Sequence, residues 1–364
     1  MKRALIFIIF VIMLTSPCHA DLAAEQAEVY GINALEQAEP PSARAAVGDM
    51  KISAASDVKN TLDSIWCAVK KSAADELRSA GSGALSVLMI VVICSMLASV
   101  FDGGRLPEYI TLAGCLAIAY TAVNSVWSLV SMSSDTLNEL SDFSKVLLPT
   151  MCTVAASAGA VTSASAKYAA TALFMDMLIT AANKIVVPLI YAYIASIIAG
   201  AAIGSKGIAG VSKLIKWFCT VLMTAITTAF AAYLSLTGAI TGAADAAAVK
   251  ATKTAVSAAL PVVGSIISDA ASSIVAGAGL LRGAVGIFGM TAICAACAAP
   301  FAALGLRYLL YKAVAACTAV LPSGRLSELV GGIGTAFGML LGLIGCGGIM
   351  LFLSVISSVK AVGL

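Results

Sequence analysis

The sequence predicts an all-α, polytopic membrane protein. Hydrophobic residues make up 60% of the 364 residues and charged residues only 11%, whereas a soluble domain carries about 25% charged residues. The mean hydropathy is +0.99, and many apolar runs approach the ~20 residues that a helix needs to cross a bilayer. We therefore expect about seven to nine crossings or re-entrant segments, following a short extracytoplasmic N-terminal segment.

The first residues have the parts of a secretory signal peptide, so we assign residues 1–20 to a leader. A basic start and an apolar run too short to span precede small residues and a cleavage position after Ala20. A retained N-terminal anchor is the alternative. In both cases the chain after Ala20 emerges outside the cytoplasm, so we assign residues 21–83 to an extracytoplasmic segment and residues 84–364 to the membrane domain.

Within the extracytoplasmic segment, the stretch "DVKNTLDSIWCAVKKSAADELR" (Asp57–Arg78) predicts an amphipathic helix. Apolar residues such as Leu62, Trp66 and Val69 recur at steps of three and four residues. Such a helix either packs on the membrane domain or lies on the membrane surface or on a partner. The pattern does not separate these two interpretations.

The clearest membrane spans are Gly83–Val100 and Tyr109–Val130. The later apolar stretches, some of them interrupted by proline or polar residues, are Phe143–Ala166, Tyr168–Val187, Val186–Gly204, Trp217–Gly238, Leu260–Leu281, Gly283–Leu306, Leu309–Leu321 and Gly331–Val359.

Two polar stretches between these spans predict their orientation. The stretch "SSDTLNELSDFSK" (residues 133–145) is acidic, and "SKGIAGVSKLIKW" (residues 205–217) carries three lysines and no acid. We interpret both as loops. Because Lys and Arg concentrate on the cytoplasmic side, the second loop is expected inside and the first outside.

A 112-residue offset suggests an internal duplication of residues 145–250 and 257–362. Pro149 and Pro261, each preceded by leucine, are related by this offset, and so are Pro188 and Pro300. Duplicated halves with interrupted segments in matching places recur in transporters, where they build the transport site. We therefore expect discontinuous helices at Leu148–Pro149 and Leu260–Pro261.

Ionisable residues inside membrane segments are expensive, and each is by default a functional hypothesis. Asp176 and Asp269 are the strongest acidic candidates, while Lys167, Lys184, Arg282, Arg307 and Lys312 are the basic ones. The alternative without a functional role is that the basic side chains extend to the membrane–water interface and the acidic side chains pair locally. The candidate pathway or broken-helix residues are Pro149, Asp176, Pro188, Pro261, Gly264, Asp269 and Pro300.

No catalytic, cofactor or metal motif is found in the sequence. It has neither a G-x-x-x-x-G-K-[ST] phosphate loop nor a G-x-S-x-G elbow, and its one histidine, His19, lies in the expected leader. Of the 10 cysteines, Cys294 and Cys297 form a CxxC spacing, which we interpret as small packing residues because structural metal sites usually need four ligands. No basic patch is dense enough for nucleic acid.

The block "KTAVSAALPVVGSIISDAASSIVAGAGLLRGAVGIFG" (Lys253–Gly289) resembles the stage III sporulation protein AE family of endospore-forming bacteria. The order of features over nearly the whole chain is also similar to that family. The resemblance implies a subunit of the sporulation channel complex, in the mother-cell membrane around the forespore. It implies partners in that complex, including its ATPase and ring-forming proteins, and support of forespore gene expression.

The leading hypothesis is a non-enzymatic polytopic subunit of a channel or secretion-like complex, surrounded by membrane lipid and powered by a partner. A self-contained secondary transporter with duplicated halves is the alternative, and solute uptake by the chain alone in liposomes would favour it. A third class is a structural anchor that recruits partners through residues 21–83. Self-association into a homo-oligomer stays open.

Overall fold

The computed structural model describes residues 31–52, 58–101, 105–157, 159–259, 264–322 and 324–360. Within these ranges the regular structure is helical and no strand occurs, which confirms the all-α polytopic class. The expected signal peptide, His19 and Pro261 lie outside the described residues.

Two short helices precede a set of long ones. The short helices are α3 (Ile32–Gln37) and α4 (Pro41–Val47). The long helices are α5 (Val58–Val100), α6 (Leu106–Ser157), α7 (Val161–Ala181), the π-helical turn η2 (Ala182–Val186) that joins α7 to α8 (Val187–Ile203), α9 (Lys206–Ala259), α10 (Gly264–Thr318) and α11 (Gly324–Lys360).

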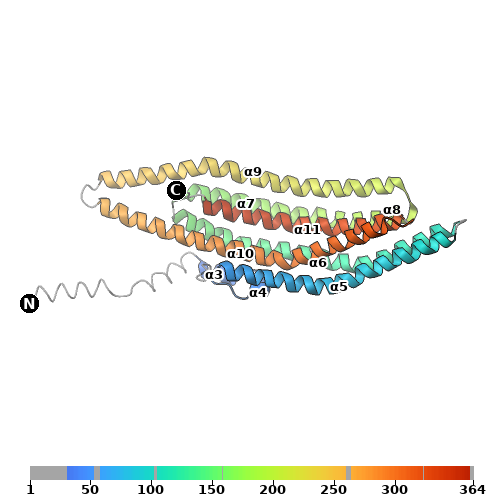
Figure 1. The fold of residues 1–364 in the computed structure, drawn as a ribbon. Coiled ribbons are helices and arrows are strands. Elements are labelled where there is room, and N and C mark those ends of the chain that lie inside the picture. Colours follow the sequence, from blue (N-terminus) through green and yellow to red (C-terminus); the bar gives the residue numbers. More distant parts are fainter. Residues whose placement is uncertain are drawn as a thin grey trace, which may run out of the picture.

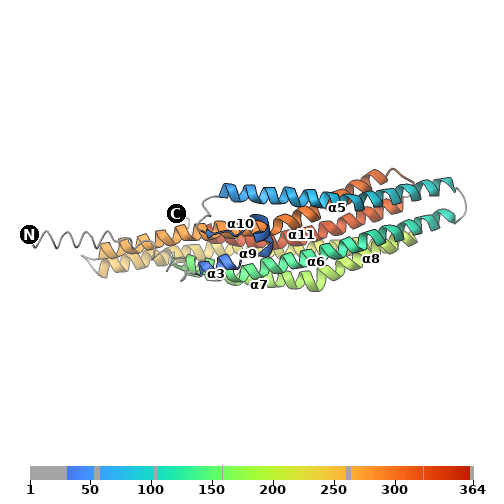
Figure 2. The same ribbon diagram turned by 90° about the horizontal axis from the view of Figure 1, so that it is seen from below.

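The long helices lie side by side along one axis and form an elongated bundle (Figures 1 and 2). Helix α11 is its centre, since it contacts each of the other long helices from α5 to α10. Its buried residues recur at three- and four-residue steps, for example at Leu326, Leu329, Val330 and Ile333. This period gives one continuous apolar stripe along a helix. In α11 the stripe continues through its whole length, and the neighbouring helices cover it.

Two glycines of α11 permit close contact with α10. A Cβ atom at Gly334 would lie 3.2 Å from the Tyr311 Cβ, and one at Gly338 would lie 3.1 Å from the Tyr308 ring. Gly342, one further step along the same helix, has nothing within 4 Å of its Cβ position. The small-residue spacing of membrane helices therefore acts in packing at the first two positions, and the third faces open space.

Six helices in the described part of the chain are long and apolar enough to cross a membrane, fewer than the expected seven to nine crossings. They are Lys59–Val100, Leu106–Ser157, Val161–Ile203, Gly207–Thr237, Leu281–Thr318 and Gly324–Val359. The difference arises because several separate apolar windows belong to one continuous helix. The windows beginning at Tyr109 and Phe143 both begin in α6, and three windows lie wholly or largely in α10.

The helices are longer than a bilayer requires. Helix α9 has 54 residues and α10 has 55, which correspond to roughly 80 Å at ~1.5 Å per residue. The hydrocarbon core is only ~30 Å thick. Each of these helices therefore extends well beyond the bilayer as an ordered rod.

The two polar stretches expected as loops are helical, which corrects that prediction. Residues 133–145 lie inside α6, and α9 begins at Lys206, so only a short turn precedes it. Polar residues remain helical there because the helix continues past the apolar region; Ser133 and Thr136 also donate side-chain hydrogen bonds to backbone carbonyls four residues earlier. Orientation is still predicted from the same charges, which now lie in the interior of α6 and at the start of α9.

Two helix–helix turns meet at one end of the bundle. Gly204 adopts a left-handed conformation (φ 71°) and ends α8. A Cβ atom there would lie 2.5 Å from the Arg325 guanidinium carbon at the start of α11. The α8–α9 turn therefore lies against the α10–α11 turn. A side chain at Gly204 would strain the left-handed backbone and displace the Arg325 guanidinium.

The predicted helix forms, and most of its large apolar side chains do not pack on the rest of the chain. It is the first half of α5 and continues without interruption across the expected boundary at residues 83 and 84. Ile65 is buried, and smaller or polar residues face inward further along. Leu62, Trp66 and Leu77 are 51%, 58% and 51% exposed. The largest apolar side chains of this half thus remain uncovered by the chain itself.

The duplication of residues 145–250 and 257–362 stays a prediction. Pro188 and Pro300 each lie in the first arm of a helical hairpin, α7–η2–α8 with α9 and α10 with α11. Pro149 instead lies inside α6, and its expected counterpart Pro261 lies outside the described residues.

Candidate functional site

The described prolines from the sequence analysis interrupt their helices less than expected. Helix α6 continues through Pro149 to Ser157, so the helix break expected at Leu148–Pro149 does not occur. Pro300 is buried inside the equally continuous α10. A proline removes one backbone hydrogen bond, yet neighbouring helices can hold its helix in place. The actual break lies at Gly159, whose φ of 90° separates α6 from α7.

Pro188 does perturb its helix, by a local change of register. It follows the π-helical turn η2, in which the Val187 N–H donates to the Ala182 carbonyl five residues earlier. Because proline has no N–H for the Lys184 carbonyl, the wider turn accommodates the lost bond. Single π turns of this kind are frequent at functional sites.

Asp176 lies on the outside of the bundle. It is exposed on α7, between Leu173 at 64% exposure and Met177 at 40%. Among the described residues it has no hydrogen bond or ion pair. The other acidic candidate, Asp269, lies on α10, and its side chain is outside the described part. Gly264 is the first residue of the same helix. The described candidates are therefore distributed over α6, α7, α8 and α10 and do not form one cluster.

Buried polar side chains instead gather near the C-terminal end of α11. The Lys167 ammonium donates to the Ser357 carbonyl at 2.6 Å, and the Thr171 and Ser354 hydroxyls are 2.7 Å apart. Arg282 from α10 donates to the Val359 carbonyl. Cations at a helix C-terminus complement its dipole and its free carbonyls. Two of the basic candidates thus fasten α7 and α10 to the end of α11.

Asp245 of α9 caps the start of α7. Its two carboxylate oxygens accept the Thr162 and Ser163 backbone N–H groups at 3.0 and 2.9 Å, and the residue is 7% exposed. Burial alone would raise the pKa of Asp245, but the hydrogen bonds from Ser163 and Thr162 together lower it below its ordinary value. The carboxylate therefore stabilises the fold above its ordinary pKa, and acidification through the lowered pKa removes that contribution.

We predict that Asp245→Ala loosens the α7 N-terminus. Loss of a capping acceptor costs about 1–2 kcal/mol, because the Thr162 and Ser163 N–H groups lose their partner. Hydrogen exchange of the amides around residues 161–164 should accelerate. Asp176→Ala is the matched control, since Asp176 is exposed on the same helix without a partner in the described residues; equal protection in both variants would contradict the capping role.

An ion pair joins α5 to α10. The Arg307 Nε contacts a Glu76 carboxylate oxygen, and the two side chains are only 14% and 18% exposed. The two residues are 231 positions apart in sequence. This pair accounts for Arg307, one of the cations that the sequence places in a membrane segment.

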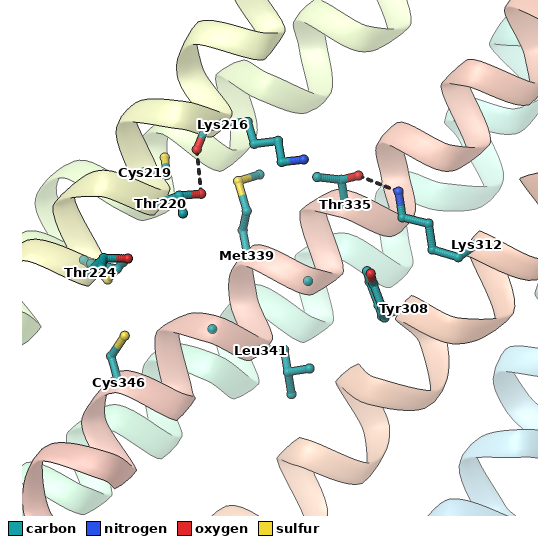
Figure 3. Close-up of a pocket in the computed structure, with 13 residues that line it drawn as sticks. Lys216, Cys219, Thr220, Thr224, Tyr308, Lys312, Thr335, Met339, Leu341 and Cys346 are labelled. Carbon is teal, nitrogen blue, oxygen red and sulfur yellow. Dashed lines mark hydrogen bonds between the residues drawn. The ribbon is translucent and has the colours of Figure 1, made fainter. Parts of the chain in front are cut away.

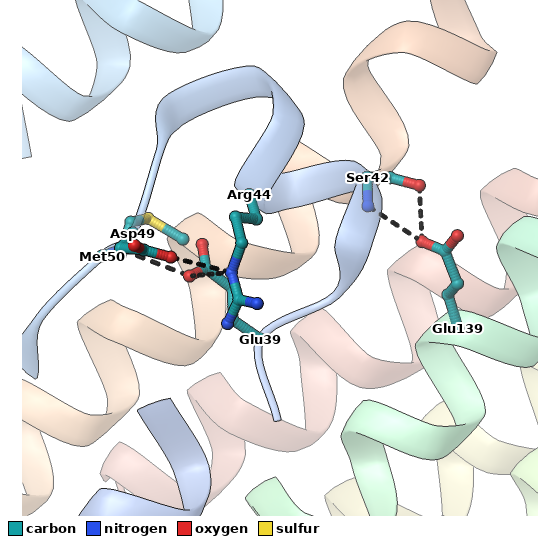
Figure 4. A network of polar contacts seen from close by, with 6 residues as sticks. All are labelled: Glu39, Ser42, Arg44, Asp49, Met50 and Glu139. Carbon is teal, nitrogen blue, oxygen red and sulfur yellow. Dashed lines mark hydrogen bonds and ion pairs between the residues drawn. The ribbon is translucent and has the colours of Figure 1, made fainter. Parts of the chain in front are cut away.

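A second polar network fixes the N-terminal helices against the bundle (Figure 4). Glu139 of α6 accepts the Ser42 backbone N–H at 3.2 Å and its hydroxyl at 2.5 Å, near the start of α4. Arg44 lies between Asp49, at 2.8 Å, and Glu39, at 4.0 Å. The acidic part of α6 therefore contacts the N-terminal helix α4 and holds it against the bundle.

Glu39 makes the docking of these helices sensitive to pH. It is 4% exposed, its Oε2 accepts the Met50 N–H at 3.2 Å, and its Oε1 has no hydrogen-bond partner among the described residues. Burial raises the pKa of Glu39 above its ordinary value, although the Met50 hydrogen bond and Arg44 oppose this. The stability contribution of the protonated carboxyl is full below the ordinary pKa and is lost as pH rises through the raised pKa.

We predict that Glu39→Gln removes this pH dependence. The neutral amide keeps an acceptor for the Met50 N–H and does not ionise, so α3 and α4 should remain protected as the pH rises through the raised pKa of Glu39. Hydrogen exchange of residues 41–52, corrected for intrinsic rates, measures the effect. Equal loss of protection with rising pH in the wild type and the variant would contradict it.

The described residues offer no group of three or more histidine, cysteine or acidic side chains that could hold a metal ion. The nine cysteines from Cys67 to Cys346 are free, and Cys294 is exposed whereas Cys297 is partly buried. On one helix these two lie three residues apart, in the wall of α10. We find no arrangement for nucleophilic or redox catalysis among the described side chains.

Sequence reasoning missed Asp245, Glu76 and Glu139, which the structure shows to hold helices together. Asp245 is the only acid in its alanine-rich stretch. An isolated carboxylate among small apolar residues could have indicated a specific hydrogen-bond partner. Glu76 and Glu139 lie in polar stretches that the sequence analysis assigns to regions outside the membrane. A carboxylate exposed to water is common there and does not indicate a specific role.

Comparison with known proteins points to one family. A family model described as Stage III sporulation protein AE matches residues 48–361, a range that contains every long helix from α5 to α11. The Stage III sporulation protein AE of Bacillus subtilis (strain 168) is 22% identical over 244 residues, which cover 66% of this chain and 61% of that protein. The chain thus aligns with less than two thirds of that relative's length. No solved structure matches the chain.

Proposed function

Because the chain belongs to the stage III sporulation protein AE family, we propose that it is a non-enzymatic membrane subunit of the channel complex that links mother cell and forespore. Its place is the mother-cell membrane around the forespore, with the N-terminal segment extracytoplasmic. Its role is to support forespore gene expression and spore development.

The observation that carries this proposal is the extent of the family match. Residues 48–361 include all six helices that are long and apolar enough to cross a membrane in the described chain. What defines the family in this chain is therefore the helical bundle itself. A sporulation protein whose family-defining part is a membrane bundle acts in or on a membrane during spore formation.

The chemistry of the bundle interior favours a structural role over a catalytic one. Lys167 and Arg282 bond to carbonyls of α11, Asp245 caps α7, and Arg307 pairs with Glu76. These ionisable groups are occupied in holding helices together. Energy for transport then comes from another subunit, for which the ATPase of the complex is the natural source.

Partner docking is supported by side chains that the bundle leaves uncovered. Leu62, Trp66 and Leu77 of α5 are more than half exposed, and Asp176 faces outward from α7 without a partner in the described residues. We propose that these surfaces receive other subunits of the complex, including its ring-forming proteins. A second copy of the chain is also a candidate for the outer face of α7.

Removal of the gene from sporulating cells tests the proposal. We expect engulfed forespores to form but late forespore reporters to stay silent and spore yield to fall, with recovery when the wild-type chain is restored. Asp176→Asn, which leaves the bundle contacts intact, should restore the protein level but not full reporter activity. Normal reporter activity and spore yield in the deletion strain would contradict the proposed function.

A further inference from the structure

A groove of about 400 Å³ runs along α11 between α9 and α10 (Figure 3). Its floor includes Gly338, which packs against the Tyr308 ring, and Gly342, where the missing side chain leaves room above the helix. Helix α9 contributes a wall with Cys219 and Met223, and α10 contributes Tyr308. The volume lies within the ~300–1,000 Å³ range of small-molecule sites.

One end of the groove is cationic. Lys216 of α9 and Lys312 of α10 both line it, with Thr335 of α11 between them in the view of Figure 3. The Lys312 ammonium donates to the Thr335 hydroxyl at 2.8 Å and to the Gly331 carbonyl at 2.9 Å. Its position is therefore fixed by the protein. The Lys216 side chain has no such bond in the described structure.

Lys216 and Lys312 line the same end of the groove, so their two positive charges repel each other. No acidic residue lines the groove, and neither lysine forms an ion pair among the described residues. Two like charges brought together without a counter-charge favour an anion between them. The complementary group is a phosphate or carboxylate that reaches both lysines.

The rest of the groove is apolar and opens to the bundle surface. Away from the lysines, its lining is mainly Met223, Met339, Leu341 and the two glycines. Gly342 and Thr220 are exposed, so the groove is open along its side. All three walls belong to helices that are long and apolar enough to span a membrane. Where these helices cross the bilayer, an opening on this surface would face lipid.

The direction of the groove fits a lipid from the cytoplasmic leaflet. Its cationic end lies toward the α8–α9 and α10–α11 turns, because Lys216 is near the start of α9 and Lys312 is near the end of α10. Lys213 and Arg325 belong to the same ends of α9 and α11. A basic helix end is expected on the cytoplasmic side. Basic pockets between membrane helices on that side bind the head groups of acidic lipids.

We propose that this groove binds one anionic phospholipid. Its phosphate lies between Lys216 and Lys312, and one acyl chain follows the floor over Gly338 and Gly342. The lipid fills the space that α9 and α10 leave open and neutralises the two ammonium groups.

Native mass spectrometry of the full chain in detergent, titrated with phosphatidylglycerol or phosphatidylcholine, tests the proposal. A lysine near an anionic membrane surface contributes about 1 kcal/mol, so Lys216→Gln should weaken phosphatidylglycerol binding about five-fold. Lys216→Gln with Lys312→Gln should weaken it roughly thirty-fold by the same conversion. Gly342→Leu should weaken both lipids, since a side chain there enters the groove without meeting protein within 4 Å of its Cβ.

Lys213→Gln is the matched control, because Lys213 is an exposed lysine of α9 outside the groove; it should bind as the wild type does. Lys216 makes no side-chain bond in the described structure, so its single variant tests the site even if the double variant folds poorly. Three results would each overturn the proposal: equal weakening by Lys213→Gln and Lys216→Gln, equal wild-type affinity for both lipids, or wild-type binding by Gly342→Leu.

Discussion

Reversing the charge of Arg307 is expected to detach α5 from the bundle. In Arg307→Glu a second carboxylate faces Glu76, at a site where the two native side chains are 14% and 18% exposed. Breaking a buried ion pair typically costs about 3–5 kcal/mol, because one charge is left without compensation. We expect a clear loss of thermal stability in detergent and lower abundance in the membrane.

Two further variants separate the pair from general charge effects. Glu76→Arg combined with Arg307→Glu restores opposite charges and should recover most of the stability. Lys145→Glu is the control, since Lys145 pairs with Asp142 on the surface, where the side chains are 70% and 73% exposed, and surface pairs contribute only about 0–1 kcal/mol. Equal stability of Arg307→Glu and Lys145→Glu would show that the α5–α10 contact does not depend on this pair.

Filling the space at Gly347 is expected to separate the central helix from two neighbours. A Cβ atom there would lie 2.7 Å from Leu137 of α6 and 3.7 Å from Leu178 of α7. Gly347→Leu therefore overpacks the point where α6, α7 and α11 meet, at a cost of about 1–3 kcal/mol or more. The melting temperature of the purified protein measures the loss.

The same substitution at Gly305 provides the control. Gly305 of α10 has nothing within 4 Å of its Cβ position, so Gly305→Leu should leave the melting temperature nearly unchanged. Gly347→Leu with Leu137→Ala exchanges volume between the two helices and should recover part of the stability. If Gly305→Leu and Gly347→Leu melted alike, α11 would not be packed as described.

The amino-acid pattern is sufficient to predict the helical membrane class, because composition and apolar periodicity are local properties. It also predicts a helix over residues 57–78, although not which face packs. The small residues of α5 face inward and Trp66 faces outward, since close approach to α10 suits small side chains. A choice of this kind depends on the partner helix, which the local pattern does not contain.

Helix continuity was the main error, and its cause is physical. Polar residues 133–145 predict a loop only if a helix ends where the bilayer ends. Helix α6 instead continues as an ordered rod of 52 residues, stabilised by neighbouring helices and by Glu139 contacts to Ser42. Likewise, Asp245 caps a helix through backbone amides more than 80 positions away in the sequence. The periodicity of the stretch around Asp245 cannot reveal such a distant partner.

The prolines show the same limit at single residues. Pro149, Pro188 and Pro300 share one chemistry but have three outcomes: a partly buried position in a continuous helix, a π-helical turn, and a buried position in α10. Packing around each proline decides how the lost hydrogen bond is accommodated. The sequence could therefore identify the positions but not the distortion at each one.

The central claim is that this bundle serves spore formation as one subunit of a larger membrane complex. Purification of the tagged chain from membranes of sporulating cells, in mild detergent after brief cross-linking, tests it most directly. We predict that the ATPase and ring-forming subunits of the complex copurify with the wild-type chain and that Asp176→Asn reduces their recovery without reducing that of the chain. Recovery of the wild-type chain alone, at its normal abundance and without those subunits, would contradict the claim.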